Sequence, residues 1–308
     1  MKLLIYGVTG FLGGNIACHF KDKMNVHGVA KRASIEKFSK LQGMDYHPFD
    51  FDKNSEILRQ IKPNIIIFCI SLDHNQSNIS YSATVDKNIR IYAKVLEDLK
   101  STGLQNTKVI YLSTAQTLLN GDIFSRVSDC KNMYGLTHLA CEKFSDISPD
   151  LNIVNLRIPN VIGVPKSPFA NIWWNILPSL IKSALLENKM EIKSDGTPTR
   201  VFIDVSDFCL AVGEIISKDF AKTSRNLNII PPHEFSISEF AQIIRNITSE
   251  YLSQDVFMKV PSDFSWDARV KSSRYENFIE ETGYIGSPNS YTPLKKTILD
   301  LIQEISKN

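Results

Sequence analysis

The first twenty residues place a glycine-rich segment between a short apolar run and a helical pattern. Lys2 to Tyr6 is mostly apolar, as in a buried strand, and Asn15 to Phe20 repeats apolar side chains at helical spacing. Between them, residues 7–14 read Gly-Val-Thr-Gly-Phe-Leu-Gly-Gly. Glycines at a strand-to-helix turn allow a tight bend and close approach of a ligand to the backbone, and the helix N-terminus that follows attracts anions. The chain is therefore predicted to open with a strand, an anion-binding turn and a helix.

Strand and helix patterns continue to alternate through the first half of the chain. Val26 to Ala30 and Lys108 to Leu112 have the apolar content of strands, and Ile65 to Ile70 is an unbroken apolar run. Such a run suits a parallel strand that helices cover on both faces. Residues 85–99 place apolar side chains along one stripe of a helix. This order predicts an α/β fold with a doubly wound parallel sheet, the Rossmann arrangement.

A second, smaller lobe is predicted after about residue 160, where prolines interrupt the pattern. These are Pro159, Pro165, Pro168 and Pro178. Ser236 to Ile247 and Leu294 to Ile305 have the spacing of amphipathic helices. We expect residues 1–160 plus about 201–225 to form a dinucleotide-binding domain, and residues 161–200 plus 226–308 to form a C-terminal α/β substrate lobe.

The composition excludes several classes of protein. The 308 residues include 35 Lys plus Arg and 33 Asp plus Glu, and the net charge of +2 is too balanced for a dedicated nucleic-acid binder or an electrostatic membrane anchor. The longest apolar stretch is far shorter than the roughly 20 residues that cross a bilayer. The five cysteines are scattered without Cys-x-x-Cys spacing, so reduced thiols and no metal site are expected. The chain is predicted to be a soluble cytoplasmic protein.

Four further motifs follow the glycine turn, whose own spacing is Gly-x-x-Gly-x-x-Gly. Residues 109–114 read Val-Ile-Tyr-Leu-Ser-Thr, and residues 134–138 read Tyr-Gly-Leu-Thr-His. Residues 156–163 read Leu-Arg-Ile-Pro-Asn-Val-Ile-Gly, and residues 200–207 read Arg-Val-Phe-Ile-Asp-Val-Ser-Asp. In this order they resemble the extended short-chain dehydrogenase/reductase superfamily, in the NAD-dependent epimerase/dehydratase branch that modifies nucleotide sugars. One position departs from that pattern, because His138 stands where the family has lysine.

The glycine turn predicts a dinucleotide cofactor, since a turn between a strand and a helix suits a pyrophosphate. The second strand ends in Lys31 and Arg32, which could meet a ribose 2′-phosphate, and no carboxylate stands there for a 2′-hydroxyl. NADP is therefore favoured, with NAD left open. The resemblance adds Asp50 and Phe51 at the adenine and Asn88 beside the cofactor. The predicted cofactor-binding residues are Gly7, Thr9, Gly10, Phe11, Leu12, Gly13, Lys31, Arg32, Asp50, Phe51 and Asn88.

The resemblance assigns catalysis to Thr114, Tyr134 and His138. Tyr134 and His138 are four residues apart, so they share one face of a helix. By resemblance, the tyrosine exchanges a proton with the sugar oxygen and Thr114 hydrogen-bonds the same oxygen. A mostly neutral histidine cannot lower the tyrosine pKa as a lysine does, so Tyr134 should stay protonated and act as an acid. This favours reduction of a ketone over oxidation of an alcohol.

Neighbouring residues narrow the reaction further. Ala115 and Gln116 replace the acid pair of dehydrating family members, and neither can move protons. By resemblance, Asn160 and Arg200 contact the nucleotide sugar. We predict an NADPH-dependent reductase acting on a nucleoside-diphosphate 4-keto-6-deoxy sugar in polysaccharide biosynthesis. The alternatives are a nucleotide-sugar 4-epimerase that holds NAD tightly and a non-catalytic NADP-binding sensor or scaffold, and the resemblance also implies pairing into a homodimer.

Overall fold

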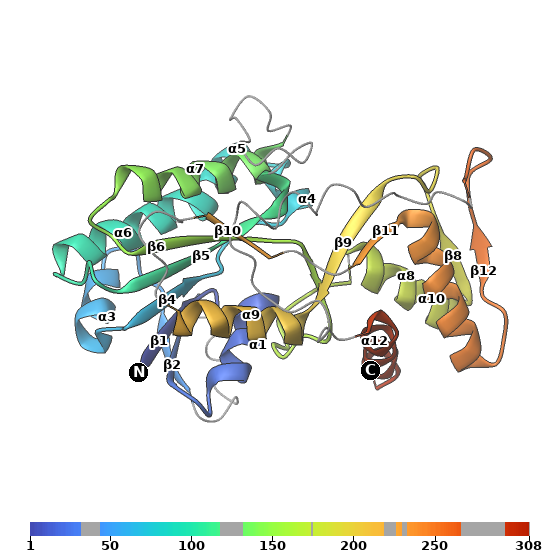
Figure 1. Ribbon diagram of the computed structural model, residues 1–308, viewed down its shortest axis with the longest axis horizontal. Coiled ribbons are helices and arrows are strands. Elements are labelled where there is room, and N and C mark those ends of the chain that lie inside the picture. The colour runs from blue at the N-terminus through green and yellow to red at the C-terminus, as the bar shows by residue number, and fades with distance from the viewer. Residues whose placement is uncertain are drawn as a thin grey trace.

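A central parallel sheet forms the larger part of the computed structural model, which describes residues 1–31, 44–117, 132–173, 175–218, 226–229, 233–265 and 293–307 (Figure 1). Within these ranges the sheet has seven strands in the order β10-β6-β5-β4-β1-β2-β3, each parallel to its neighbours. The order reverses between β1 and β4, which is the switch point at which open α/β sheets bind ligands. The predicted doubly wound α/β fold is confirmed. The strands are β1 (Lys2–Tyr6), β2 (Asn25–Ala30), β3 (Asp45–Pro48), β4 (Ile65–Phe68), β5 (Lys108–Thr114), β6 (Ile153–Ile158) and β10 (Asn226–Asn228).

Helices cover both faces of the central sheet. Helices α1 and α9 lie on one face, and α3, α6 and α7 lie on the other (Figure 1). Shorter helical segments, α4, α5 and η2, follow the carboxyl ends of β4 and β5, and the π-helix η1 leads directly into α6. The bounds are α1 (Phe11–Phe20), α3 (Asn54–Ile61), α4 (His74–Ser77), α5 (Tyr81–Thr84), η1 (Val85–Arg90), α6 (Ile91–Ser101), η2 (Ala115–Thr117), α7 (Met133–Ile147) and α9 (Val205–Ser217).

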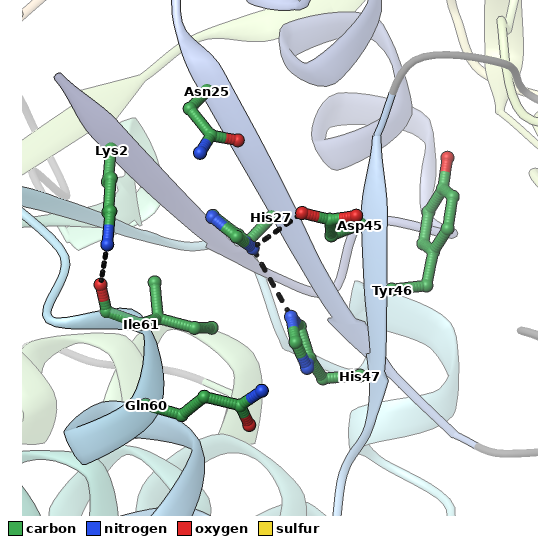
Figure 2. Close-up of a pocket in the computed structure, with 8 residues that line it drawn as sticks. All are labelled: Lys2, Asn25, His27, Asp45, Tyr46, His47, Gln60 and Ile61. Atoms are coloured by element: carbon green, nitrogen blue, oxygen red, sulfur yellow. Dashed lines mark hydrogen bonds and ion pairs between the residues drawn. The ribbon is translucent and has the colours of Figure 1, made fainter.

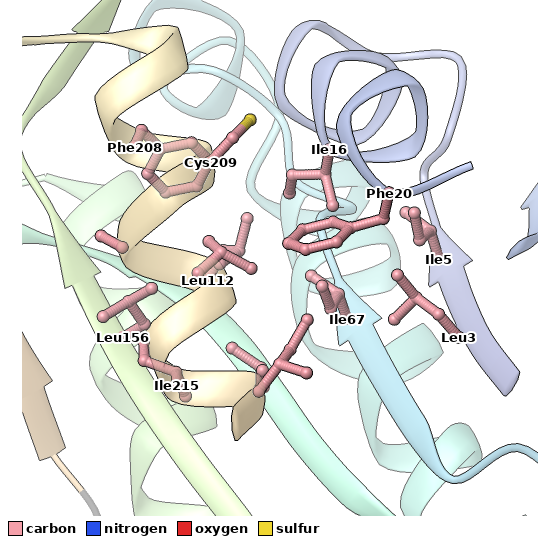
Figure 3. Close-up of a cluster of buried hydrophobic side chains, with 14 of the residues drawn as sticks. Leu3, Ile5, Ile16, Phe20, Ile67, Leu112, Leu156, Phe208, Cys209 and Ile215 are labelled. Atoms are coloured by element: carbon pink, nitrogen blue, oxygen red, sulfur yellow. The ribbon is translucent and has the colours of Figure 1, made fainter. Parts of the chain in front are cut away.

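The strands bury both of their faces because helices cover both. In β1, Leu3 and Ile5 belong to the apolar cluster under α1 and α9, while Leu4 belongs to the cluster under α3, α6 and α7. Figure 3 shows the first cluster, in which Phe20 of α1 and Ile215 of α9 lie over apolar strand residues. This two-sided burial explains why β1 and β4 are continuous apolar runs in the sequence.

A second lobe contains smaller sheets packed against helices. Strand β9 (Thr199–Asp204) lies parallel to β7 (Asn160–Ile162) and antiparallel to β11 (His233–Ser236), and β8 (Lys189–Glu191) pairs with β12 (Phe257–Lys259). Its helices are α8 (Ile176–Glu187), α10 (Ile237–Leu252) and α12 (Leu294–Ser306). Their apolar faces meet in one cluster, where Phe202 of β9 stacks on Phe240 of α10 with ring centroids 4.3 Å apart.

Polar contacts fix two helix ends in this lobe. Helix α10 begins with a capping box, in which Ser236 Oγ accepts a hydrogen bond from the Glu239 backbone and the Glu239 carboxylate accepts one from the Ser236 backbone. Thr297 of α12 donates to the Asp204 carboxylate at 2.7 Å, where β9 leads into α9. Helix α12 is therefore attached to the segment that returns to the central sheet.

The structure differs from the expected pattern in two places. The helix expected over residues 85–99 begins as the π-helix η1 and becomes α-helical at Ile91. Strand β10 extends the central sheet, whereas the sequence assigns residues 226–308 to the second lobe; the domain boundaries stay a prediction. Across the described ranges, no helix has both the length and the apolar content to span a bilayer.

Candidate active site

The glycine turn lies at the switch point of the central sheet. Gly7 has a φ of +86°, a conformation that favours glycine, and its N–H donates to the Val29 carbonyl at 2.9 Å. A Cβ added to Gly7 would lie 3.1 Å from the Cys69 carbonyl carbon, which follows β4. The backbone between β1 and α1 is thus held between the carboxyl ends of β2 and β4.

The first turn of α1 packs directly on that backbone. A Cβ added to Gly13 would lie 2.3 Å from the Gly7 carbonyl oxygen, so only glycine fits there. The first hydrogen bond of the helix runs from the Gly14 N–H to the Gly10 carbonyl, at 2.9 Å. The N–H groups of Phe11, Leu12 and Gly13 therefore have no partner within the helix and form, with the positive end of its dipole, an anion site.

A loop that follows β7 closes over the glycine turn. Ser167 Oγ donates to the Thr9 carbonyl at 2.6 Å, and its side chain is buried. The predicted contact of Thr9 with the cofactor is thus accompanied by a contact with the chain that enters the second lobe.

Positive charge gathers beyond the end of β2. Lys31 is exposed there, and Arg32 lies outside the described residues. Burial lowers the pKa of Lys87 in η1, the nearby charge of Lys31 lowers it further, and the carboxylate of Asp73 opposes both effects. Lys87 thereby adds a cation to the region in which the sequence predicts a ribose 2′-phosphate.

The predicted adenine residues lie beside two further cations. Asp50 is exposed and accepts a hydrogen bond from the Asp52 N–H at 3.0 Å. The ring of Phe51 has the Arg90 guanidinium 4.7 Å from its centroid and the Lys94 ammonium 5.8 Å away. The contacts of Asp50 and Phe51 with adenine stay a prediction.

Asn88 is buried and uses both ends of its amide within the protein. Its oxygen accepts from the Leu72 N–H at 2.7 Å, and its nitrogen donates to Thr137 Oγ1 at 2.9 Å. Asn88 therefore joins the loop after β4 to α7. Its contact with the cofactor stays a prediction.

The structure brings the predicted catalytic side chains together at the carboxyl end of β5. Thr114 is the last residue of β5, and the Tyr134 hydroxyl hydrogen-bonds its side chain. One helical turn along α7, the His138 ring packs edge to face against the Tyr134 ring, with centroids 4.6 Å apart. Burial raises the pKa of Tyr134, the Thr114 hydrogen bond opposes this rise, and the charge of Asp73 adds to it. Tyr134 is thus protonated at neutral pH.

His138 is neutral in this site. Its side chain is 2% exposed, and burial lowers its pKa to about 4. Nδ1 lies 2.8 Å from the Tyr111 hydroxyl, whereas the buried Nε2 has no hydrogen-bond partner among the described residues. The residue in the lysine position therefore supplies no charge at neutral pH.

Two residues that the sequence motifs do not single out lie next to Tyr134. Asp73, the N-cap of α4, is close enough to affect the Tyr134 pKa, and the exposed ring of His74 lies 6.2 Å from the Tyr134 ring. Both follow β4, whose carboxyl end borders the switch point. That position is the signal in the sequence that could have identified them.

The site fits a dinucleotide. The first N–H groups of α1, which have no partner within the helix, suit a pyrophosphate, and Nε2 of His138, without a partner among the described residues, leaves a polar atom for a bound group at the other end of the site. The predicted substrate residues Asn160 and Arg200 lie on β7 and β9, both exposed. Asn160 donates to the Val201 carbonyl at 2.9 Å, and Arg200 donates to the Thr199 carbonyl at 2.7 Å. Their contacts with substrate stay a prediction.

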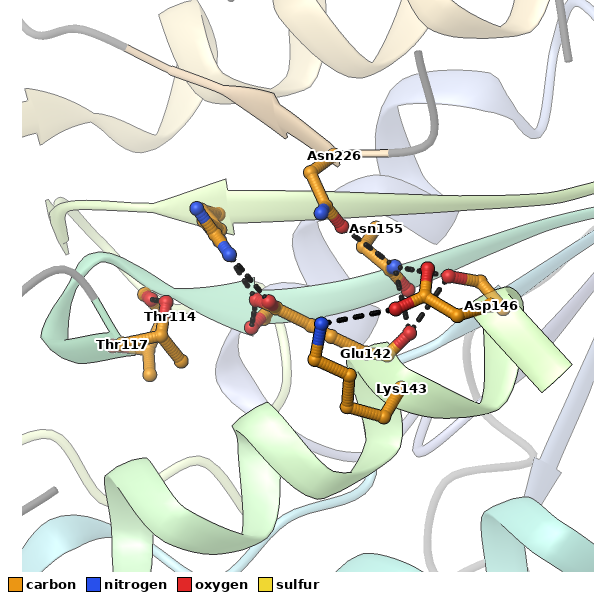
Figure 4. A network of polar contacts seen from close by, with 10 residues as sticks. Thr114, Thr117, Glu142, Lys143, Asp146, Asn155 and Asn226 are labelled. Atoms are coloured by element: carbon orange, nitrogen blue, oxygen red, sulfur yellow. Dashed lines mark hydrogen bonds and ion pairs between the residues drawn. The ribbon is translucent and has the colours of Figure 1, made fainter. Parts of the chain in front are cut away.

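A buried ion pair holds α7 against the sheet below the catalytic side chains (Figure 4). The Glu142 carboxylate accepts hydrogen bonds from Arg157 Nε at 2.9 Å and Nη2 at 2.6 Å, and a third from Ser113 Oγ. Glu142 and Arg157 are 2% and 5% exposed. Since Ser113 precedes Thr114 and Glu142 follows His138 by one turn, this network fixes the strand and the helix that carry the predicted catalytic side chains.

A separate pocket of about 370 Å³ lies at the opposite, amino-terminal edge of the sheet (Figure 2). In it, His27 Nδ1 is 3.3 Å from His47 Nε2 and 3.5 Å from the Asp45 carboxylate. Burial lowers the pKa of both histidines. In the part of the chain that the structure describes, no group of three or more His, Cys, Asp or Glu is arranged to hold a metal ion.

Gly13→Ala is expected to weaken NAD(H) binding about tenfold or more, because its Cβ must push the α1 N–H groups away from the turn. Gly213→Ala in α9 is the matched control, since its Cβ would lie 3.4 Å from the Phe20 ring, an ordinary contact. Calorimetric titration measures both affinities. Equal affinities would contradict the proposed anion site.

Glu142→Ala is expected to lower the free energy of unfolding by about 3–5 kcal/mol, because it leaves the Arg157 guanidinium buried without its partner. The control is Lys143→Ala on the same helix, which removes an exposed pair with Asp146 and should cost about 1 kcal/mol or less. Urea unfolding measures both variants. Similar losses in the two would show that the buried network does not stabilise α7.

Comparisons with known proteins agree with this geometry. A model of the NAD dependent epimerase/dehydratase family matches residues 3–229. The UDP-glucose 4-epimerase of Thermotoga maritima is 16% identical with a TM-score of 0.76, and the UDP-glucuronic acid 4-epimerase of Bacillus cereus is 19% identical with a TM-score of 0.74. TunA, an NAD-dependent NDP-hexosamine 5,6-dehydratase, is 16% identical with a TM-score of 0.74. Each covers 100% of this chain, which in turn covers 99%, 99% and 98% of theirs.

These distant structural likenesses show the fold, and the family match goes further. The matched residues run from β1 to the end of β10 and include the glycine turn, Thr114 and the Tyr134 helix. The chain therefore belongs to the NAD dependent epimerase/dehydratase family.

Proposed function

We propose that this protein transfers hydride at C4 of a sugar attached to a nucleoside diphosphate, and that its net reaction is 4-epimerisation with tightly held NAD. The hydrogen bond between Tyr134 and Thr114 carries the proposal, because it directs a proton donor and a second hydroxyl toward one oxygen. The family, and similar structures that are 4-epimerases, support epimerisation more than the reductase that the sequence predicts.

The chain's own residues move one proton in each half of this reaction. Bound NAD(P) supplies the hydride acceptor and donor. In oxidation, Tyr134 as phenolate takes the proton of the sugar hydroxyl while Thr114 hydrogen-bonds the same oxygen; in the return step, Tyr134 gives the proton back. Ala115 and Gln116 cannot move a proton, so the two residues that follow Thr114 in the sequence supply no acid or base for dehydration.

A second candidate, an NADPH-dependent 4-ketoreductase, is favoured by the neutral His138. Without a positive charge beside it, Tyr134 keeps its proton and is ready to act as the acid in ketone reduction. Lys31, exposed at the end of β2, supports the NADP preference of this candidate. Arg200 and Asn160 serve both candidates as contacts for the diphosphate and the sugar.

Use of the cofactor separates the two candidates. An epimerase converts UDP-glucose or a related nucleotide sugar without consuming added NAD(P)H, whereas a reductase consumes one NADPH per 4-ketosugar. Product analysis measures the conversion of the nucleotide sugar, and absorbance at the NADPH band measures the consumption of NADPH. Stoichiometric NADPH consumption without epimerised product would contradict the 4-epimerase proposal.

The pH dependence provides an independent check. Because the pKa of Tyr134 is raised, the phenolate fraction, and with it the epimerisation rate, should rise about tenfold per pH unit between pH 7 and 9. Ketone reduction needs the protonated form of Tyr134, so its rate should not change over the same pH range. Initial rates at saturating substrate measure this, and an epimerisation rate that falls as pH rises would contradict the role of Tyr134 as the base.

Tyr134→Phe is expected to lower turnover about 10²–10⁴-fold while leaving NAD(H) affinity nearly unchanged. Tyr81→Phe, which changes an exposed tyrosine on α5, is the control and should retain full activity. Turnover equal to that of the unmodified protein would exclude proton transfer by Tyr134. If neither the unmodified protein nor Tyr134→Phe turns over any nucleotide sugar, while both bind NADP, the sensor or scaffold alternative takes precedence.

A further inference from the structure

Tyr111, in the middle of β5, touches His138 from below the catalytic group. Its hydroxyl lies 2.8 Å from His138 Nδ1, and the two residues are 1% and 2% exposed. Tyr111 belongs to none of the catalytic or binding assignments above. A hydrogen bond buried to this degree fixes the ring orientation of His138 and also affects which ring nitrogen carries its proton.

Neutral histidine has a single N–H, so two arrangements compete. With the proton on Nδ1, His138 donates to Tyr111, and the Tyr111 proton needs another acceptor. With the proton on Nε2, the Tyr111 hydroxyl donates to Nδ1, and the Nε2–H becomes the unpartnered group.

Cys141 decides between these arrangements. Its thiol donates to the Asn88 carbonyl at 3.3 Å and also hydrogen-bonds the Tyr111 hydroxyl. Since its one proton points to Asn88, the sulfur can only accept from Tyr111. Sulfur is a weak acceptor and a bare imidazole nitrogen is a good one, so the Tyr111 proton goes to Nδ1 of His138.

We propose that Tyr111 is a positioning residue that holds His138 in the Nε2–H tautomer, and that this N–H donates to a hydroxyl of the nicotinamide ribose. The inference rests on the proposed function insofar as it takes the site to bind NAD(P). A neutral donor thereby takes the place of the lysine ammonium group.

Burial of the orphaned nitrogen supports this arrangement. The Nε2 atom is fully buried, and among the described residues it has no partner. Buried donors are rarely left unpaired, so a ligand hydroxyl is the natural acceptor here. The ring of Tyr134, one turn away on the same face of α7, places the nitrogen beside the residue that moves the proton.

Nitrogen-15 NMR of the full chain labelled at histidine tests the tautomer directly. At pH 7 without ligand, the His138 signals should show a protonated Nε2 and a bare Nδ1, and a spectrum of His138→Gln assigns them by loss. A protonated Nδ1 in the unmodified protein would overturn the proposal, whatever the protein's activity.

Tyr111→Phe tests the consequence for binding. Titration should show NAD⁺ affinity reduced about tenfold, as for one lost hydrogen bond, with ADP affinity unchanged because ADP lacks the nicotinamide ribose. The control is Tyr92→Phe, since the Tyr92 ring packs 4.5 Å from the Tyr111 ring and its buried hydroxyl has no partner among the described residues.

The outcomes are separable from those of the proposed function. Unchanged NAD⁺ affinity in Tyr111→Phe, or an equal loss for NAD⁺ and ADP, would overturn the positioning role. A protein that shows the Nε2–H tautomer and binds NAD⁺ but converts no nucleotide sugar would contradict the proposed reaction and leave this inference standing.

Discussion

The close approach of Gly13 to the Gly7 carbonyl sets the geometry of the glycine turn at the carboxyl edge of the sheet. It brings the first turn of α1 onto the end of β1, where a side chain at position 13 would collide with backbone. The unpartnered N–H groups of α1 are thereby fixed beside the switch point between β1 and β4. Because β4 and β5 are neighbours in the same sheet, Thr114 and α7 follow at a set distance from the anion site.

The proposed catalytic group is uncharged at neutral pH. Tyr134 keeps its proton, His138 has a pKa of about 4, and Thr114 is neutral. The charges near the group lie at its edges, with Asp73 on one side and the buried Glu142–Arg157 pair below. The proposed proton transfer at Tyr134 would therefore depend on bound groups and on pH more than on a fixed neighbouring cation.

The sequence predicts those features of the site that depend on local spacing. The glycine turn, the parallel strands and the shared face of Tyr134 and His138 all follow from residues within one or two turns of each other. The partners of His138 do not, because Tyr111 comes from another element and its contact depends on how β5 and α7 pack. The π-helix η1 is missed for a different reason, because its apolar spacing matches that of an α-helix.

The net reaction is the part of the function that residue types predict least. Both candidates use the same Thr114 and Tyr134, and they differ in whether the cofactor is regenerated within the site. The sequence favours reduction through His138, whereas the proposed function is epimerisation.

The bond between Thr297 and Asp204, which attaches α12, has a different kind of consequence, for synthesis on the ribosome. The seven described strands of the central sheet have been synthesised by residue 228, whereas the apolar sides of α8 and α10 are covered only once α12 has been synthesised. A nascent chain therefore exposes the apolar sides of α8 and α10 to chaperones until residues 294–306 have been synthesised.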